Sequence, residues 1–129
     1  MKKLNDKGFT LVELLAVLVI LIAITGIAIP TISSSLERTK DKQNEARYKI
    51  LESAAEQYVT DYKNDVYINL NNLGRNSCFI TLTDLSEYLS SDDMKDADGE
   101  ELTGRVIFEK PNNYNYTETS TEWPEFSCK

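Results

Sequence analysis

Residues 7–15 read Lys7-Gly8-Phe9-Thr10-Leu11-Val12-Glu13-Leu14-Leu15, and they open an apolar run that continues to Ile32. The nineteen residues from Leu14 to Ile32 carry no charge, and Glu13 is the one charged residue between Phe9 and Thr31. At about 1.5 Å per residue, a helix over 9–32 is roughly 36 Å long, enough to cross a hydrocarbon layer of about 30 Å. The stretch therefore predicts a membrane-spanning helix over residues 9–32.

The basic leader before this helix differs from a secretory signal peptide. Lys2, Lys3 and Lys7 precede Gly8, where the leader ends before the apolar run begins. A secretory signal is cleaved after its apolar region at a small-residue site, and no Ala-x-Ala-like site ends this run. Cleavage after Gly8 would therefore leave the helix on the mature chain.

Two features inside the apolar run are unusual for a membrane helix. An ionisable residue costs about 2.5–3.5 kcal/mol at the centre of such a helix and less near its end. Glu13 is therefore expected to have a partner, either a positive charge on another chain or the amide groups of its own first turn. Pro30 lacks a backbone donor and crowds the preceding turn, which predicts a kink or loosening between Gly26 and Pro30. Gly26 also suits close packing against another helix.

The stretch from Gly8 to Leu15, with lysines before it and about twenty apolar residues after it, resembles a known leader. It is similar to the class III leader and N-terminal helix of type IV pilins and of the pseudopilins of type II secretion and competence systems. The resemblance is close over residues 1–35 and beyond them concerns only the layout of the chain.

The resemblance implies a role for several residues. Gly8 would be the last leader residue, cut by a prepilin peptidase on the cytoplasmic face, and the same enzyme would N-methylate Phe9. Glu13 would pair with the amine of Phe9 on a neighbouring subunit as a filament grows. Gly26 and Pro30 match positions where helices of the family lose regularity in assembled pili. The implied partners are this peptidase and N-methyltransferase, other copies and related pilins, an inner-membrane assembly platform, and membrane lipid before assembly.

Charge limits the remaining partners and orients the chain. The 129 residues carry a net charge of -7, and removal of residues 1–8 leaves 11 basic and 20 acidic residues, or -9. Such a chain lacks the basic face that phosphate-backbone binding needs, so nucleic acid is not indicated. The basic leader belongs on the cytoplasmic side. We therefore expect a single-pass protein of the cytoplasmic membrane with its acidic C-terminal part outside, and later a cell-surface filament.

Residues 33–63 are predicted to continue the helix as an amphipathic segment. An apolar stripe at helical spacing begins near residue 50. It consists of Ile50, Leu51, Ala54, Ala55, Tyr58, Val59 and Tyr62. The part over 33–45 is therefore expected to be an exposed stalk, and the later part to pack on a head. Mixed charges over 37–49 are read as a solvated face, with an assembly surface as the alternative.

Residues 64–129 are predicted to form that head. Helical period is lost after Lys63, and the asparagine-rich residues 64–65 and 69–74 are expected to form a loop. A short capped helix is expected over 83–89, with Thr83 or Asp84 as the cap. Residues 105–110 and 114–119 look like antiparallel strands joined by a turn at 111–113. The fold class is therefore α+β, pilin-like, with a long N-terminal helix, half transmembrane and half amphipathic, packed on a small antiparallel sheet. The expected divisions are 1–8, 9–32, 33–63 and 64–129.

The segment 90–101 is rich in carboxylates and is expected to be an exposed loop. Its acidic residues are Asp92, Asp93, Asp96, Asp98, Glu100 and Glu101. Their spacing does not fit the calcium-binding loop pattern, so a solvated loop is favoured over a calcium site.

The two cysteines, Cys78 and Cys128, lie in the part expected outside the cytoplasm. An even number there predicts one disulfide, which would hold the C-terminal segment on the head. Free thiols in a reducing setting are the alternative.

No residues suggest catalysis or a cofactor. The chain has no histidine, no Gly-x-Ser-x-Gly, no glycine-rich phosphate loop and no metal-ligand spacing. We therefore expect a structural filament subunit that serves adhesion, motility, DNA uptake or secretion. The alternative is a minor pilin, pseudopilin or membrane-anchored tip protein whose tyrosines (Tyr88, Tyr114, Tyr116) bind a ligand, although such tyrosines more often pack.

Overall fold

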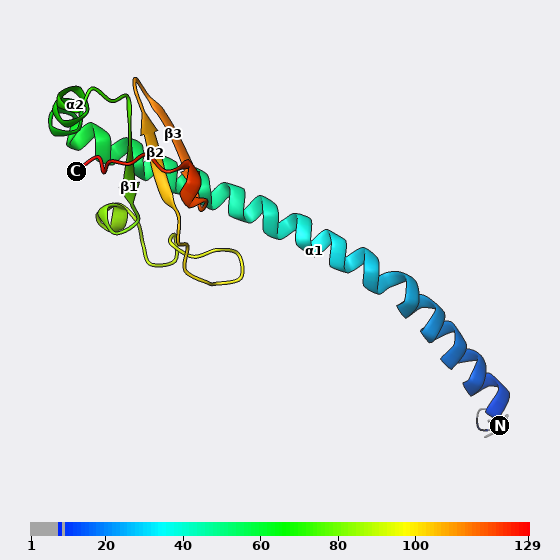
Figure 1. Ribbon diagram of the computed structural model, residues 1–129. Helices are drawn as coiled ribbons and strands as arrows, with labels where there is room; N and C mark the ends of the chain where they lie inside the picture. The colour runs from blue at the N-terminus through cyan, green and yellow to red at the C-terminus, as the bar shows by residue number, and fades with distance from the viewer. Residues whose placement is uncertain (1–7, 9) are drawn as a thin grey trace. The chain divides into compact units, whose positions relative to one another are not determined.

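The computed structural model describes residue 8 and residues 10–129 and combines helices with a small sheet (Figure 1). The elements in chain order are α1 (Leu11–Asp61), α2 (Lys63–Asn72), β1 (Ser77–Thr81), the 3-10 helix η1 (Asp84–Glu87), β2 (Arg105–Glu109), β3 (Asn113–Thr117) and the 3-10 helix η2 (Ser120–Glu122). The chain forms two compact units, the N-terminal unit Met1–Thr39 and the head unit Lys40–Lys129, and α1 contributes to both. The predicted α+β class is confirmed.

The predicted apolar stripe of α1 forms one side of the core in the head unit. Its buried residues are Leu51, Ala54, Ala55, Tyr58 and Val59, whose spacing keeps them on one helix face. The stripe is narrower than predicted, because Ile50 and Tyr62 are 44% and 43% exposed. Full burial of a side chain such as Leu51 contributes about 1.5–3 kcal/mol, so this short segment anchors the head.

The sheet supplies the opposite side of the core. Its order is β1-β2-β3, and both pairs are antiparallel. Val106 and Phe108 of β2 are fully buried, because alternate residues of a strand point to the same face. The two predicted strands are β2 and β3, and their antiparallel pairing is confirmed. Strand β1 is not one of the two strands predicted from the sequence.

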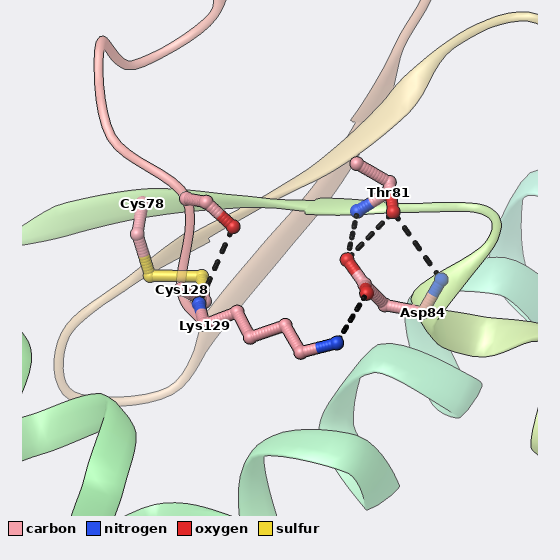
Figure 2. Close-up of a disulfide and its surroundings, with 6 residues drawn as sticks. Cys78, Thr81, Asp84, Cys128 and Lys129 are labelled. Carbon is pink, nitrogen blue, oxygen red and sulfur yellow. Dashed lines mark hydrogen bonds and ion pairs between the residues drawn. A yellow bond between two sulfur atoms is a disulfide. The ribbon is translucent and has the colours of Figure 1, made fainter.

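The C-terminal segment is fastened to β1 by the predicted disulfide between Cys78 and Cys128 (Figure 2). Backbone hydrogen bonds reinforce it: the amide of Phe79 donates to the carbonyl of Phe126 at 3.0 Å, and the amide of Cys128 donates to the carbonyl of Phe79 at 2.9 Å. The tail therefore runs along the free edge of β1, which leaves less of that strand open to other chains.

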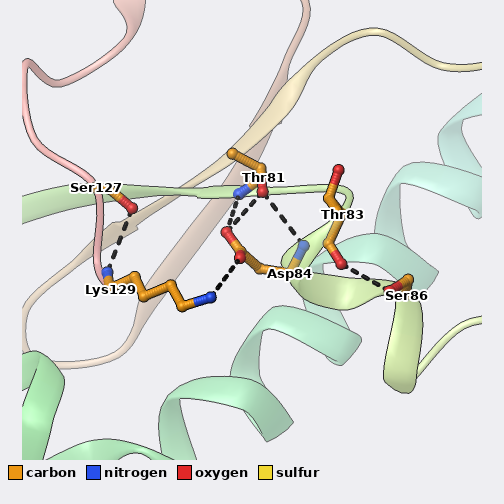
Figure 3. Close-up of polar contacts among 6 residues, drawn as sticks. All are labelled: Thr81, Thr83, Asp84, Ser86, Ser127 and Lys129. Carbon is orange, nitrogen blue, oxygen red and sulfur yellow. Dashed lines mark hydrogen bonds and ion pairs between the residues drawn. The ribbon is translucent and has the colours of Figure 1, made fainter.

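The cap of η1 differs from the prediction. The Thr83 side chain makes no capping hydrogen bond. Instead, Oδ2 of Asp84 accepts from the amide of Thr81 at 3.2 Å and from its hydroxyl at 2.6 Å, while Oγ1 of Thr81 accepts from the amide of Asp84 at 3.2 Å (Figure 3). Asp84 thus closes the turn after β1 instead of capping the next helical turn, because Thr81 offers it two donors.

The predicted loop after Lys63 is wrong, since residues 63–72 form α2. Val66 and Leu70 are each 1% exposed, and their spacing of four residues places them on one helix face toward the core. The many asparagines of this segment argued for a loop, but the burial of these two apolar residues outweighs that local preference.

The acidic segment 90–101 is not a wholly solvated loop, and the stalk predicted over 33–45 does not extend to residue 45. Nη1 of Arg47 donates to the carbonyls of Asp92 and Lys95, each at 2.8 Å. Oδ1 of Asn44 accepts from the amide of Ala97 at 2.8 Å. Lys40 forms an ion pair with Asp98. Polar side chains of α1 therefore hold the loop against the helix. The apolar stripe predicts only the apolar contacts of α1, so this polar contact was not expected.

Candidate functional site

The first turn of α1 contains a reciprocal cap. The amide of Thr10 donates to Oε2 of Glu13 at 3.0 Å, and the amide of Glu13 donates to Oγ1 of Thr10 at 3.2 Å. This is the capping box, in which residues three apart satisfy each other's free amides. The negative carboxylate also lies at the positive end of the helix dipole. Thr10-Leu11-Val12-Glu13 therefore starts α1 at Leu11.

The structure thus places Glu13 on its own first turn, which is the second of the two expected arrangements. Pairing with the amine of Phe9 on another subunit stays a prediction, and Phe9 lies outside the described residues. Gly8 is exposed, and no atom of the described residues lies within 4 Å of the position a Cβ would take. Cleavage after Gly8 stays a prediction.

The surface of α1 in the N-terminal unit is apolar and uncovered. Its large apolar side chains are all at least half exposed, from 50% at Leu18 to 83% at Leu11. They are Leu11, Val12, Leu14, Leu15, Val17, Leu18, Val19, Ile20, Leu21, Ile22, Ile24, Ile27, Ile29, Ile32 and Leu36. With a mean hydropathy of 2.8 in its most apolar part, α1 is long and apolar enough to cross a membrane. This surface is the candidate functional site.

The helix continues through the predicted weak point. Gly26 and Pro30 both lie within α1, and nothing lies within 4 Å of a Cβ built on Gly26. The side chain of Thr31 donates to the carbonyl of Ile27 at 3.2 Å, next to the backbone bond that Pro30 cannot make. Helical structure is thus unbroken across Gly26 and Pro30 in the single chain, and the kink or loosening expected there stays a prediction.

The carboxylates of the head unit do not assemble into a metal site. No group of three or more potential ligands comes together among the residues that the structure describes. Within the acidic loop, the amide and hydroxyl of Ser90 both donate to Oδ2 of Asp93, and these bonds lower the pKa of Asp93. Asp96 accepts from the amides of Asp98 and Glu100, each at 2.9 Å. These carboxylates serve to shape the loop.

The three tyrosines weighed as ligand contacts are engaged in packing. Tyr116 is 7% exposed, and its ring stacks on Tyr48 at a centroid distance of 4.6 Å. Burial raises its pKa and also raises the pKa of Tyr114 to about 12. The hydroxyl of Tyr88 donates to Oδ2 of Asp61 at 2.7 Å, which raises the pKa of Tyr88 to about 12. None of the three is a free surface contact.

One pocket of about 420 Å³ lies beside α2 and η1, with Tyr58, Asp65 and Asp84 in its wall. Its partly buried carboxylate, Asp84, already accepts from Thr81, and Nζ of Lys129 lies 3.8 Å from Oδ1 of Asp84. The carboxylate of Asp84 is thus engaged within the chain.

Comparison with known proteins agrees with the geometry of α1. Residues 3–29 match the family model described as the prokaryotic N-terminal methylation motif. These matches support the resemblance of the N-terminal segment to type IV pilins and pseudopilins.

The curated relatives are similar to this chain over half its length. The competence protein ComGC of Streptococcus pneumoniae strain TIGR4 and that of strain R6 are each 37% identical to it over 65 residues. The match covers 50% of this chain and 60% of each relative. No solved structure matches the chain.

Proposed function

We propose that this protein is a filament subunit of the type IV pilus class, made as a prepilin. It is inserted in the cytoplasmic membrane, with the leader inside and the head outside. A prepilin peptidase cuts after Gly8 and methylates Phe9. The mature chain then leaves the lipid and polymerises through α1 on an assembly platform. The observation that carries the proposal is the uncovered apolar surface of α1 in the N-terminal unit, most of which lies within the matched methylation motif, residues 3–29.

The energetics of that surface support assembly. Each large apolar side chain left in water forgoes about 1.5–3 kcal/mol, and fifteen of them are at least half exposed. The total is tens of kcal/mol, more than the stability of a typical domain. Lipid covers this surface before assembly, and the helices of other copies cover it in the filament.

We further propose that Glu13 sets the axial position of neighbouring subunits in the same filament. In the single chain its carboxylate is held by the amide of Thr10. A protonated amine at Phe9 of a neighbouring copy carries a full positive charge that an amide lacks, and its attraction to the carboxylate is strong in a medium of low dielectric constant. Exchange of the first partner for the second would therefore favour one axial position of neighbouring chains.

The setting that we propose is a competence system, which the name of the two relatives supports. The chain spans only 60% of the length of those relatives, and the other filament systems share the same N-terminal segment. The setting is therefore tested by deletion: a strain lacking this chain should lose transformation while keeping surface adhesion and protein secretion.

The first test of the filament role is mass spectrometry of the N-terminal peptide from material sheared off the cell surface. We expect an abundant peptide that begins at methylated Phe9. Gly8→Arg should leave an uncut precursor in the membrane, while Lys7→Arg should be processed normally. Efficient maturation of Gly8→Arg, or an unprocessed N-terminus in the sheared fraction, would contradict the proposal.

The second test asks whether assembly depends on Glu13 itself or on any carboxylate of α1. Glu13→Ala should be processed but absent from sheared filaments, because the charge that sets register is gone. Glu37→Ala, an acidic residue of the same helix outside the apolar run, is the matched control and should assemble. Normal filaments from Glu13→Ala would remove the pairing from the proposal.

A minor or tip subunit is the second candidate. The presence of Glu13, which can pair with a neighbouring copy, favours a shaft subunit instead. So do the contacts that Tyr88, Tyr114 and Tyr116 make within the head, because they leave no tyrosine of this set free for a ligand. Quantitative mass spectrometry of sheared filaments decides between them, because a shaft subunit dominates the fraction and a tip subunit is rare in it.

A further inference from the structure

Two lysines flank one tyrosine where α1 gives way to α2. Nζ of Lys63 lies 5.7 Å from the ring centroid of Tyr67, and Nζ of Lys110 lies 5.3 Å from it. The group is fixed in place: the hydroxyl of Tyr67 donates to the carbonyl of Pro111 at 2.9 Å, and Nζ of Lys110 donates to Oδ1 of Asn71 at 2.6 Å. We call Lys63, Tyr67, Asn71 and Lys110 the dibasic site.

The dibasic site is unusual in an acidic protein because its charges are not neutralised locally. Among the described residues, the ion pairs involve other cations and leave Lys63 and Lys110 without a carboxylate. The nearby acids point elsewhere. Asp65 lines the pocket beside η1, and Glu109 follows buried Phe108 in β2, so its side chain leaves the other face of the sheet. Two ammonium groups therefore remain available for an anion.

The excess of negative charge gathers at the other end of the head unit. The acidic loop, residues 90–101, is held on α1 at Lys40, Asn44 and Arg47. Its residues Asp92, Glu100 and Glu101 are exposed, and the side chain of Asp92 is 89% exposed although its Oδ1 lies 3.7 Å from Nζ of Lys95. Along α1, Asn44 and Asp61 are about 26 Å apart at 1.5 Å per residue. The loop and the dibasic site thus lie at opposite ends of the head, as Figure 1 also shows for the loop after η1 and for α2.

We propose that the dibasic site of one copy binds the acidic loop of a second copy. The inference rests on the proposed filament, in which every subunit has the same polarity. Head-to-tail contacts of this kind join two different surfaces, and they extend into a helical filament when they do not close. Opposite charges at the two ends of one head suit that contact and disfavour an end-to-end contact between two like ends, which would bring like charges together. This contact lies in water, and together with the pairing of Glu13 it would fix the axial position of neighbouring subunits.

Zero-length carbodiimide cross-linking of sheared filaments, followed by peptide mass spectrometry, tests the contact directly. We expect an amide link between Lys63 or Lys110 and Asp92, Glu100 or Glu101. Because these groups lie at opposite ends of one head, such a link has to join two copies. Filaments that form normally but yield no such link would overturn this contact and leave the proposed function intact. Failure of the unaltered chain to form filaments would contradict both.

Charge reversal supplies the functional test. Lys63→Glu/Lys110→Glu should lower the amount of filament at least about tenfold, since like-charge contacts cost several kcal/mol. Asp92→Lys/Glu100→Lys should do the same, and the combined fourfold variant should restore assembly. Lys49→Glu, an exposed lysine on α1 between the two ends, is the matched control and should assemble normally. An unchanged near-UV circular dichroism spectrum verifies that each head still folds.

The alternative occupant of the dibasic site is the phosphate backbone of a nucleic acid. Normal filaments from Lys63→Glu/Lys110→Glu, combined with a loss of DNA retention by those filaments, would overturn the proposal in favour of that occupant. Absence of rescue in the fourfold variant, with every head folded, would also contradict the pairing.

Discussion

Replacing Gly104 with alanine should destabilise the head more than any exposed substitution of similar size. Gly104 precedes β2 and is buried. A Cβ there would collide with the carbonyl oxygen of Thr117 and would lie 2.6 Å from Cζ and 2.7 Å from the hydroxyl oxygen of Tyr116. Tyr116 has little room to withdraw, because its ring stacks on Tyr48 and its amide donates to Glu52 at 3.1 Å.

The expected magnitude follows from two effects. Overpacking a close-packed interior costs about 1–3 kcal/mol. Moving the strand also stretches the buried hydrogen bond from the amide of Gly104 to the hydroxyl of Tyr116, now 3.1 Å, whose loss costs about 1–3 kcal/mol. A total near 3 kcal/mol lowers the melting temperature of a head of this size by roughly 12–24 °C, at about 4–8 °C per kcal/mol.

The assay is thermal unfolding of the full chain in detergent micelles, followed by near-UV circular dichroism, which reports on the tyrosines of the head. Gly26→Ala is the matched control, because nothing lies within 4 Å of the added Cβ, and it should leave this transition unchanged. A Gly104→Ala protein that melts within about 2 °C of the parent would refute the reasoning, since the neighbours would then have yielded at almost no cost.

Three further outcomes are expected for the head unit. Cys78→Ser/Cys128→Ser should lower the free energy of unfolding by about 4 kcal/mol on the chain-entropy model, for a sequence separation of 50 residues, as measured by urea denaturation. The hydrogen bond to Asp61 raises the pKa of Tyr88 to about 12, so its contribution to stability is complete below pH 10 and disappears as the pH rises to about 12. Asp61→Asn should return the pKa toward 10 in an ultraviolet absorbance titration, and an unchanged value would contradict this assignment. Arg47→Met should speed hydrogen exchange of the acidic loop without slowing leader cleavage, because it removes two donors to loop carbonyls.

The parts of the fold that follow a regular period could be predicted from the sequence. The run from Leu14 to Ile32 is too long and too apolar for a buried helix, and the stripe from Leu51 to Val59 repeats at 3.6 residues. The alternation of Val106 and Phe108 likewise indicated a strand. Each of these signals is local, so reading the chain segment by segment was enough.

The parts that depend on contacts between distant residues could not be predicted. Helix α2 looks like a loop until Val66 and Leu70 meet the core. Arg47 appears as one charge on a solvated helix face, yet it binds carbonyls 45 and 48 residues away. The dibasic site joins Lys63 and Lys110, which are far apart in the sequence. The capping box is different, because the Thr-x-x-Glu pattern is local and visible in the sequence, and the amides of the first turn were one of the two partners expected for Glu13.

That capping box bears on how the same carboxylate serves two environments. A bare carboxylate in the membrane is unfavourable, but Oε2 of Glu13 has a donor on its own turn, the amide of Thr10. The carboxylate of Glu13 therefore keeps a hydrogen-bond partner while the subunit is still in the lipid. A protonated amine of a neighbouring copy carries a full positive charge that the amide lacks, so the exchange is favourable once a second copy arrives. Thr10→Val keeps the amide that Glu13 needs and removes only the hydroxyl that caps in return. If Glu13 acts mainly through other copies, Thr10→Val assembles like the parent, and if the cap is its main role, Thr10→Val and Glu13→Ala share one phenotype.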